Sequence, residues 1–159
     1  GILPINQSQN NNPLFKAFLA SAKEAGHKIN KDMNGEDQEG FGMYDVTIHE
    51  GERASVSKYY LNPVRKKSNL KVFTKSFVEK IIFDGTKAIG IQVNINGKIN
   101  KIHVNKEIIL SSGSINSPQL LMVSGVGPAN HIKEKGIKII SATIVAIFFG
   151  AHIIQCRAS

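Results

Sequence analysis

Apolar residues recur at helical spacing near the start of the chain. One apolar set shares this spacing and consists of Leu14, Phe15, Phe18, Leu19, Ala22 and Ala25. Asn12 and Pro13 precede the set as residues typical of an N-cap and a first helical turn, and Gly26 follows it as a typical stop. The pattern predicts a surface amphipathic helix that begins at Pro13 and ends near Gly26.

Turn signals and shorter apolar runs occupy the next part of the chain. Asp32-Met33-Asn34-Gly35 is typical of a turn. The alternation of apolar and polar side chains over residues 43–49 predicts a strand. A second helix is expected to begin at Ser55 or Ser57, and Pro63 limits its regularity because proline lacks the backbone N–H.

The next part of the chain has a composition typical of β-strands. Leu70–Thr74 and Phe77–Phe83 are rich in β-branched and aromatic residues, which predicts strands. Ala88–Ile95 and Lys98–Val104 are joined by Asn96-Gly97, a dipeptide that favours a tight hairpin turn. These runs together predict an antiparallel meander.

A short apolar run and a helix are expected to follow the meander. Glu107–Leu110 is almost wholly apolar, which is typical of a strand covered on both faces. Ser117 is a good N-cap and Pro118 a good first helical residue. A meander that leads into a buried strand and flanking helices predicts an α/β fold.

Composition narrows the classes of function. The chain has 159 residues, 42% of them hydrophobic, which is enough for one buried core. The net charge is +8, but the lysines are spread along the chain, and Arg65-Lys66-Lys67 is the only short basic cluster. No nucleic-acid partner is therefore expected. The single Cys156 excludes an internal disulfide framework, and no cysteine and histidine spacing suggests a metal site.

The residues that could bind a ligand lie in the stretch SSGSINSPQLLMVSGVGP, residues 111–128. Small residues allow a ligand to approach the backbone closely, and a helix N-terminus offers free N–H groups to an anion. Two interpretations follow from the residues alone. The stretch either contacts an anion or a nucleotide, or it is a corner packed by small residues.

The same stretch carries a family resemblance. Gly113-Ser114-x-x-Ser117-Pro118-x-Leu120-Leu121-x-x-Ser124-Gly125-Val126-Gly127 resembles the second signature of the glucose–methanol–choline (GMC) flavoprotein oxidoreductases. Other runs resemble the choline-oxidising branch of this family in order and spacing: Asp32–Gly35, Gln38–Gly42, Thr47–Arg53, Tyr60–Pro63, Asn69-Leu70 and Phe83–Gly90. The similarity extends from about Gly1 to Ile140.

The resemblance implies a partial GMC-type FAD-binding fold. It implies an enzyme that oxidises a primary alcohol by moving a hydride to FAD, with choline as the expected alcohol and betaine aldehyde as the product. It also implies a mitochondrial location. In the family, backbone at the position of Val78 meets the adenine end of FAD, and Ser112, Gly113 and Ser114 lie close to the cofactor. Taken by itself, Val78 also fits a buried β-branched strand residue.

Parts of the family pattern are missing from this sequence. None of the 14 glycines forms the G-x-G-x-x-G that seats a pyrophosphate, and the family's catalytic histidine belongs to a C-terminal segment that this sequence does not contain. We therefore expect an internal piece of the enzyme, without catalytic residues or a metal and inactive by itself. No catalytic role is expected of the five histidines, His27, His49, His103, His131 and His152. Glu50 and Arg53 are expected to form an ion pair.

Three regions are expected from these comparisons of pattern. Residues 1–54 would adjoin the substrate domain, residues 55–140 would form part of the FAD-binding domain, and residues 141–159 would be a divergent apolar tail. Ile139–Ile154 has 16 residues without formal charge if His152 is neutral, just short of the roughly 17 to 25 that span a bilayer. A changed reading frame or an alternative exon end is the favoured origin of the tail. A non-catalytic fragment attached through it to a membrane or a partner is the alternative, and the oligomeric state is left open.

Overall fold

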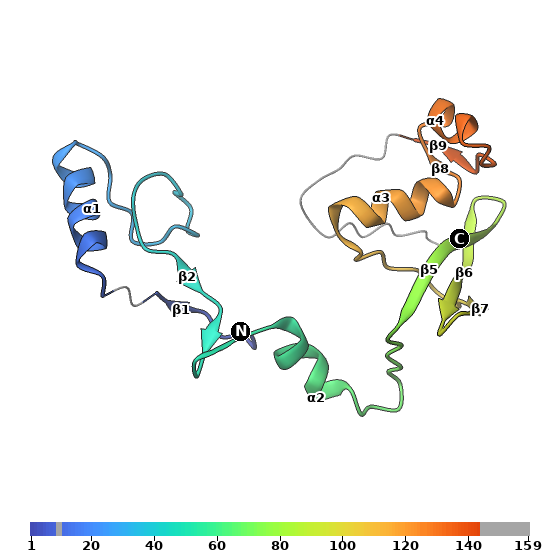
Figure 1. Ribbon diagram of the computed structural model, residues 1–159, viewed down its shortest axis with the longest axis horizontal. Helices are drawn as coiled ribbons and strands as arrows, with labels where there is room; N and C mark the ends of the chain where they lie inside the picture. The colour runs from blue at the N-terminus through green and yellow to red at the C-terminus, as the bar shows by residue number, and fades with distance from the viewer. Residues whose placement is uncertain (9–10, 144–159) are drawn as a thin grey trace. The chain divides into compact units, whose positions relative to one another are not determined.

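The computed structural model describes residues 1–8 and 11–143 and divides into two units, Gly1–Val72 and Phe73–Ser159 (Figure 1). The regions expected to meet at residues 54 and 140 were drawn from the family pattern, and they stay predictions.

The first unit opens with the helix that the apolar pattern predicts. Helix α1 spans Pro13–Glu24, and the Asn12 side-chain oxygen accepts a hydrogen bond from the Leu14 N–H at 3.0 Å. Gly26 follows with φ of +82°, a conformation that glycine adopts without strain. The predicted start, cap and stop of this helix are confirmed.

Four short strands of the first unit, one before α1 and three after it, form two antiparallel pairs. They are β1 (Asn6–Gln7) with β2 (Asp45–Val46), and β3 (Ile48–His49) with β4 (Glu52–Arg53). The single strand expected over residues 43–49 is therefore wrong. The run is broken at Thr47, whose carbonyl accepts a hydrogen bond from the Ala54 N–H at 2.8 Å, and its two halves pair with different strands. Alternation of side chains cannot reveal such a change of partner.

The second helical segment begins where serine predicts it. The Ser55 hydroxyl accepts a hydrogen bond from the Lys58 N–H at 3.2 Å. A π-helical turn, η1 (Ser57–Leu61), then leads into the short helix α2 (Asn62–Val64). Pro63 lies in the first turn of α2, directly after η1.

The second unit is built on an antiparallel meander of three strands. In sheet order they are β5 (Ser76–Asp84), β6 (Lys87–Ile95) and β7 (Lys98–His103). Asn96 and Gly97 both have positive φ, 51° and 84°, as the predicted tight turn requires. The meander is confirmed, but Leu70–Thr74 is irregular because no strand in the described chain pairs with it.

The segment after the meander differs from its prediction. Glu107–Leu110 forms no strand ladder among the described residues, and Ile109 is 58% exposed while Leu110 is 5% exposed. The expectation of a strand covered on both faces is therefore wrong for this part of the chain. Helix α3 spans Gly113–Val123, so it begins four residues before Ser117, and Pro118 lies inside it.

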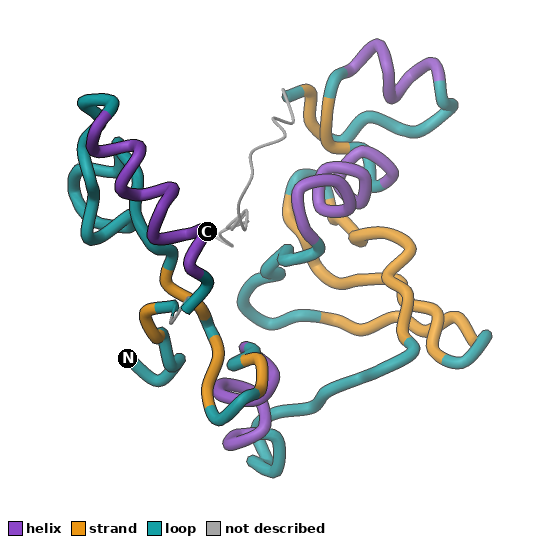
Figure 2. The backbone as a smooth tube through the Cα atoms, turned by 60° about the vertical axis from the view of Figure 1, so that its left-hand side comes forward, coloured by secondary structure: helices purple, strands orange, loops and turns teal. Residues whose placement is uncertain are grey.

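Helix α3 packs on the sheet and closes the small core (Figure 2). Three residues form the buried centre of this core: Ile81 in β5, Leu110 in the segment before α3, and Leu121 in α3. Beyond α3, β8 (Val126–Gly127) pairs in parallel with β9 (Ser141–Ala142), and α4 (Ala129–Glu134) connects them. Helices and sheets are thus mixed, as the α/β prediction requires.

The apolar tail lies largely beyond the part of the chain that the structure describes. The described residues contain no helix long and apolar enough to cross a membrane. Most of Ile139–Ile154 falls outside them.

Candidate functional site

A groove lies between the beginning of β5 and helix α3 in the second unit. Its volume is about 480 Å³, and its lining consists of Ser76, Phe77, Val78, Glu79, Ser112, Asn116, Gln119, Leu120 and Val123. Val78 and Ser112 were both chosen from the sequence as cofactor-binding residues, and the fold brings them to the same groove. They lie far apart in the chain, on a strand and at the N-cap of a helix.

The other two chosen residues begin helix α3 directly after Ser112. Gly113 has φ of +89°, and a Cβ atom built on it would have no other atom within 4 Å. Ser114 is half-buried in the next position. Neither residue belongs to the groove lining, but both lie in the first turn of α3, where backbone N–H groups have no partner within the helix.

The chemistry of the groove is that of binding rather than of proton transfer. The only ionisable side chain in the lining is Glu79, whose carboxylate accepts a hydrogen bond from the Gln92 amide at 2.7 Å. The remaining lining combines hydroxyl and amide groups with apolar side chains, including Phe77, which is 72% exposed. Such a surface can hold a planar, uncharged ring and its polar edge.

Two buried serines of the signature lie next to the groove and make hydrogen bonds that their sequence positions did not predict. Ser117 is not an N-cap, and its hydroxyl accepts a hydrogen bond from the Ser112 N–H at 3.0 Å. The Ser124 hydroxyl accepts from the Ile81 N–H at 2.8 Å and donates to the Leu120 carbonyl at 2.6 Å. The spacing of the two serines places both on one face of a mostly apolar helix, and this spacing could have indicated their buried positions.

Two Gly-x-Gly runs, Gly40-Phe41-Gly42 and Gly125-Val126-Gly127, are packed against the backbone of other segments. A Cβ atom on Gly42 would lie 2.1 Å from the Asn30 carbonyl oxygen, and one on Gly125 would lie 2.4 Å from that of Lys138. These glycines permit close contact between chain segments, so neither run is free to receive a phosphate.

The histidines in the described first unit contact aromatic rings. His27 lies 5.1 Å from the Phe41 ring, and His49 lies 6.3 Å from the Tyr59 ring, centroid to centroid. The ion pair expected between Glu50 and Arg53 is wrong. A Glu50 oxygen lies 4.0 Å from the His49 Nε2 instead, and within the described chain Arg53 has no ion pair.

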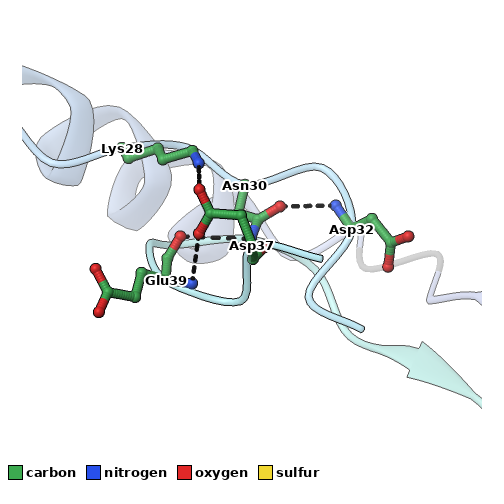
Figure 3. A network of polar contacts seen from close by, with 5 residues as sticks. All are labelled: Lys28, Asn30, Asp32, Asp37 and Glu39. Atoms are coloured by element: carbon green, nitrogen blue, oxygen red, sulfur yellow. Dashed lines mark hydrogen bonds and ion pairs between the residues drawn. The ribbon is translucent and has the colours of Figure 1, made fainter. Parts of the chain in front are cut away.

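A polar network closes the loop after α1 (Figure 3). The Asn30 amide donates to the carbonyls of Asp37 at 2.6 Å and Glu39 at 3.4 Å, and its oxygen accepts from the Asp32 N–H at 2.9 Å. The Lys28 ammonium pairs with the Asp37 carboxylate. This bond, helped by the Glu39 N–H, lowers the pKa of Asp37 below its ordinary value.

The comparison with known families decides the identity of the fold. The family model for GMC oxidoreductase matches residues 1–146. The chain belongs to the GMC oxidoreductase family. The family membership and the fold that the sequence motifs indicated are thereby confirmed.

Individual members of the GMC family are similar over most of the chain. The mitochondrial choline dehydrogenase of Homo sapiens is 44% identical over 140 residues, which are 88% of this chain and 24% of the relative. The oxygen-dependent choline dehydrogenase of Staphylococcus haemolyticus is 46% identical over 138 residues, 87% of this chain and 24% of the relative. This chain thus spans about a quarter of the length of these relatives.

Solved structures of GMC oxidoreductases superpose on most of this chain. The structure of pyridoxine 4-oxidase from Mesorbium loti matches with a TM-score of 0.81 and 26% identity. The match covers 89% of this chain and 28% of the pyridoxine 4-oxidase chain. An FAD-dependent oxidoreductase from Chaetomium thermophilum matches with a TM-score of 0.79 and 26% identity. The match covers 89% of this chain and 25% of the oxidoreductase chain.

Proposed function

We propose that this chain forms part of the FAD-binding fold of an enzyme that oxidises choline to betaine aldehyde by hydride transfer to the flavin. The observation that carries the proposal is the identity of 42–46% to choline dehydrogenases over nearly nine-tenths of the chain. The groove that joins Val78 to Ser112 is consistent with it, because its lining combines apolar side chains with hydroxyl and amide groups that can bind an adenine ring.

In this proposal Val78 and Ser112–Ser114 hold the cofactor. The backbone of Val78 lies on one wall of the groove and would meet the edge of the adenine ring. Gly113 and Ser114 would present backbone N–H groups from the first turn of α3, and Ser112, whose own N–H is bonded to Ser117, would contribute its side chain at the N-cap. FAD, when bound, supplies the hydride acceptor for the oxidation of the alcohol.

Titration of the purified chain with FAD tests the cofactor assignment. We expect weak binding, because the sequence contains no G-x-G-x-x-G run to hold the pyrophosphate. Amide signals of Val78, Ser112, Gly113 and Ser114 should shift in NMR spectra of the ¹⁵N-labelled chain, and those of α1 should not. Equal shifts in α1 would contradict the assignment.

A second measurement tests the proposed inactivity of the 159-residue chain. Flavin absorbance is followed after addition of choline and an artificial electron acceptor. We expect no turnover, because the sequence contains no G-x-G-x-x-G run to hold the pyrophosphate of the cofactor, and Glu79, the carboxylate among the described groove residues, already accepts a hydrogen bond from the Gln92 amide. A stoichiometrically yellow protein that turns over choline would contradict this part of the proposal.

Location and attachment follow the same proposal. A mitochondrial location is supported by the mitochondrial choline dehydrogenases of human and mouse, and fluorescence microscopy of the tagged chain tests it. Attachment to a membrane through residues 139–154 stays a prediction. Recovery of the chain in the soluble fraction after carbonate extraction would contradict it.

A further inference from the structure

Two buried serines occupy one face of helix α3 and its end. Ser117 is 3% exposed and Ser124 is 8% exposed. Ser117 lies within α3 and Ser124 is its C-cap, so two helical turns separate them and their side chains point to the same side. Polar side chains at such depth are retained where they hold specific hydrogen-bond partners.

Each serine accepts a hydrogen bond from a different wall of the groove. Ser117 Oγ accepts from the Ser112 N–H at 3.0 Å, and Ser112 lines the groove. Ser124 Oγ accepts from the Ile81 N–H at 2.8 Å. Ile81 belongs to β5, the strand that contributes Val78 to the opposite wall.

The bond at Ile81 is needed because β5 is an edge strand. The sheet order is β5-β6-β7, so one side of β5 has no neighbouring strand within this sheet. The register of β5 against β6 shifts between Val78 and Lys80, a bulge that turns the strand just before Ile81. Ser124 therefore holds β5 directly beside the point at which its direction changes.

The geometry points to Ser117 and Ser124 as positioning residues for the cofactor. Neither serine lines the groove, so each acts through the backbone that it holds. Ser117 fixes the Ser112 backbone at the start of α3, and Ser124 fixes β5 against the end of α3, before a ligand arrives. The ligand then spends less free energy on ordering these two segments. This inference rests on the proposed binding of FAD.

Amide hydrogen exchange and FAD titration of the ¹⁵N-labelled full chain test the inference together. Ser124→Ala should speed exchange of the Ile81 amide, and Ser117→Ala that of the Ser112 amide. Each change should weaken FAD binding by about tenfold, the size expected for one lost hydrogen bond at a binding surface. Ser124→Thr keeps the hydroxyl and should restore both the exchange protection and the affinity.

Ser21→Ala is the matched control. The Ser21 hydroxyl donates to the Ala17 carbonyl of its own helix at 3.0 Å, as Ser124 does to Leu120, but it lies in the other unit. This variant should leave FAD affinity and the exchange of Ile81 and Ser112 unchanged. Circular dichroism establishes whether each variant is folded. Because the two serines hold different segments, one alanine variant still tests the inference if the other does not fold.

Three results separate the possible failures. Unchanged exchange of Ile81 in Ser124→Ala and of Ser112 in Ser117→Ala would overturn the inference that the serines hold the walls. Faster exchange with unchanged FAD affinity would overturn their role in positioning. If the unaltered chain shows no FAD-dependent shifts at all, the proposed function fails and the cofactor role of the serines fails with it, whatever the exchange rates show.

Discussion

At Gly125 a single residue decides how the end of α3 meets the strands that follow. Its φ is +93°, and a Cβ atom would lie 2.4 Å from the Lys138 carbonyl oxygen and 2.8 Å from Ile140 Cγ1. The Gly125 carbonyl also accepts hydrogen bonds from the N–H groups of Ile140 at 2.8 Å and Ser141 at 3.2 Å. Both the backbone conformation and the close approach therefore require glycine.

Substitution of Gly125 should destabilise the second unit strongly. We expect Gly125→Ala to lower the free energy of unfolding by about 3 kcal/mol, since strain from positive φ adds to a backbone clash. Gly136→Ala is the matched control, because Gly136 has φ of +68° but no atom within 4 Å of an added Cβ. It should cost only about 1 kcal/mol. Urea unfolding measures both, and equal costs would show that the clash is relieved by movement of residues 138–140.

Asn30 is a second residue whose chemistry is constrained by its surroundings. It is 9% exposed, and its amide donates to two carbonyls, those of Asp37 and Glu39. Asn30→Asp replaces the donor with an oxygen that faces both acceptors, so we expect a loss of about 2 to 3 kcal/mol in the free energy of unfolding. Asn34→Asp changes an exposed amide in the same loop and should cost about 0.5 kcal/mol or less in urea unfolding.

At the scale of elements, the loop after α1 is held by contacts across its two arms. Ile29 forms a parallel bridge with Phe41, and the Phe41 ring contacts Phe18 of α1 at 5.5 Å between centroids. The exposed pair of Lys28 and Asp37 closes the same loop. The Phe18 contact thus joins α1 to the loop, and the bridge and the ion pair join the two arms of the loop.

The pH dependence of stability should reveal the ion pair. The pKa of Asp37 is lower in the folded chain, so its contribution is complete above the ordinary pKa of 3.8 and is lost as the pH falls through the lower folded value. Asp37→Asn should therefore be less stable than the unaltered chain at pH 7 and equal to it in stronger acid. Urea midpoints at several pH values measure this small difference. It should shrink in 1 M salt, where the Debye length is about 3 Å, and a constant difference at all pH values would contradict the role of charge.

At the scale of the whole molecule, an exposed basic stretch spans the boundary between the two units. Arg65, Lys66, Lys67, Lys71 and Lys75 are all exposed there, between the end of α2 and the beginning of β5. The lysines of β5, β6 and β7 belong to a hydrogen-bonded sheet instead. Proteases need a locally extended, unpaired chain, so these two sets of basic residues should differ in cleavage rate.

Limited digestion with trypsin should cut first within residues 65–75. Mass spectrometry should then find two products that correspond to the units Gly1–Val72 and Phe73–Ser159, each trimmed at the cut. Replacement of Arg65, Lys66 and Lys67 by glutamine should move the first cut to Lys71 or Lys75 without slowing it more than a few-fold. A first cut inside the meander would contradict the division into units.

Much of the secondary structure was predictable because its signals are local. Asn12 and Pro13 start α1, and Asn96-Gly97 turns β6 into β7, through hydrogen bonds and backbone angles confined to a few residues. Predictions failed where the partner is distant in the chain. Residues 43–49 change partner at Thr47, and 107–110 has no ladder partner in the described chain, so the apolar pattern alone could not decide either element.

The candidate site divides in the same way. The sequence by itself determined the family, through an ordered set of short motifs, and it indicated Val78 and Ser112–Ser114 through those motifs. Only the tertiary structure showed that Val78 and Ser112 share a groove, that Ser117 and Ser124 accept hydrogen bonds from its walls, and that Gly125 is packed against Lys138. The physical reason is that motifs specify local backbone and side-chain chemistry, whereas burial and hydrogen-bond partners depend on which distant segments the folded chain brings together.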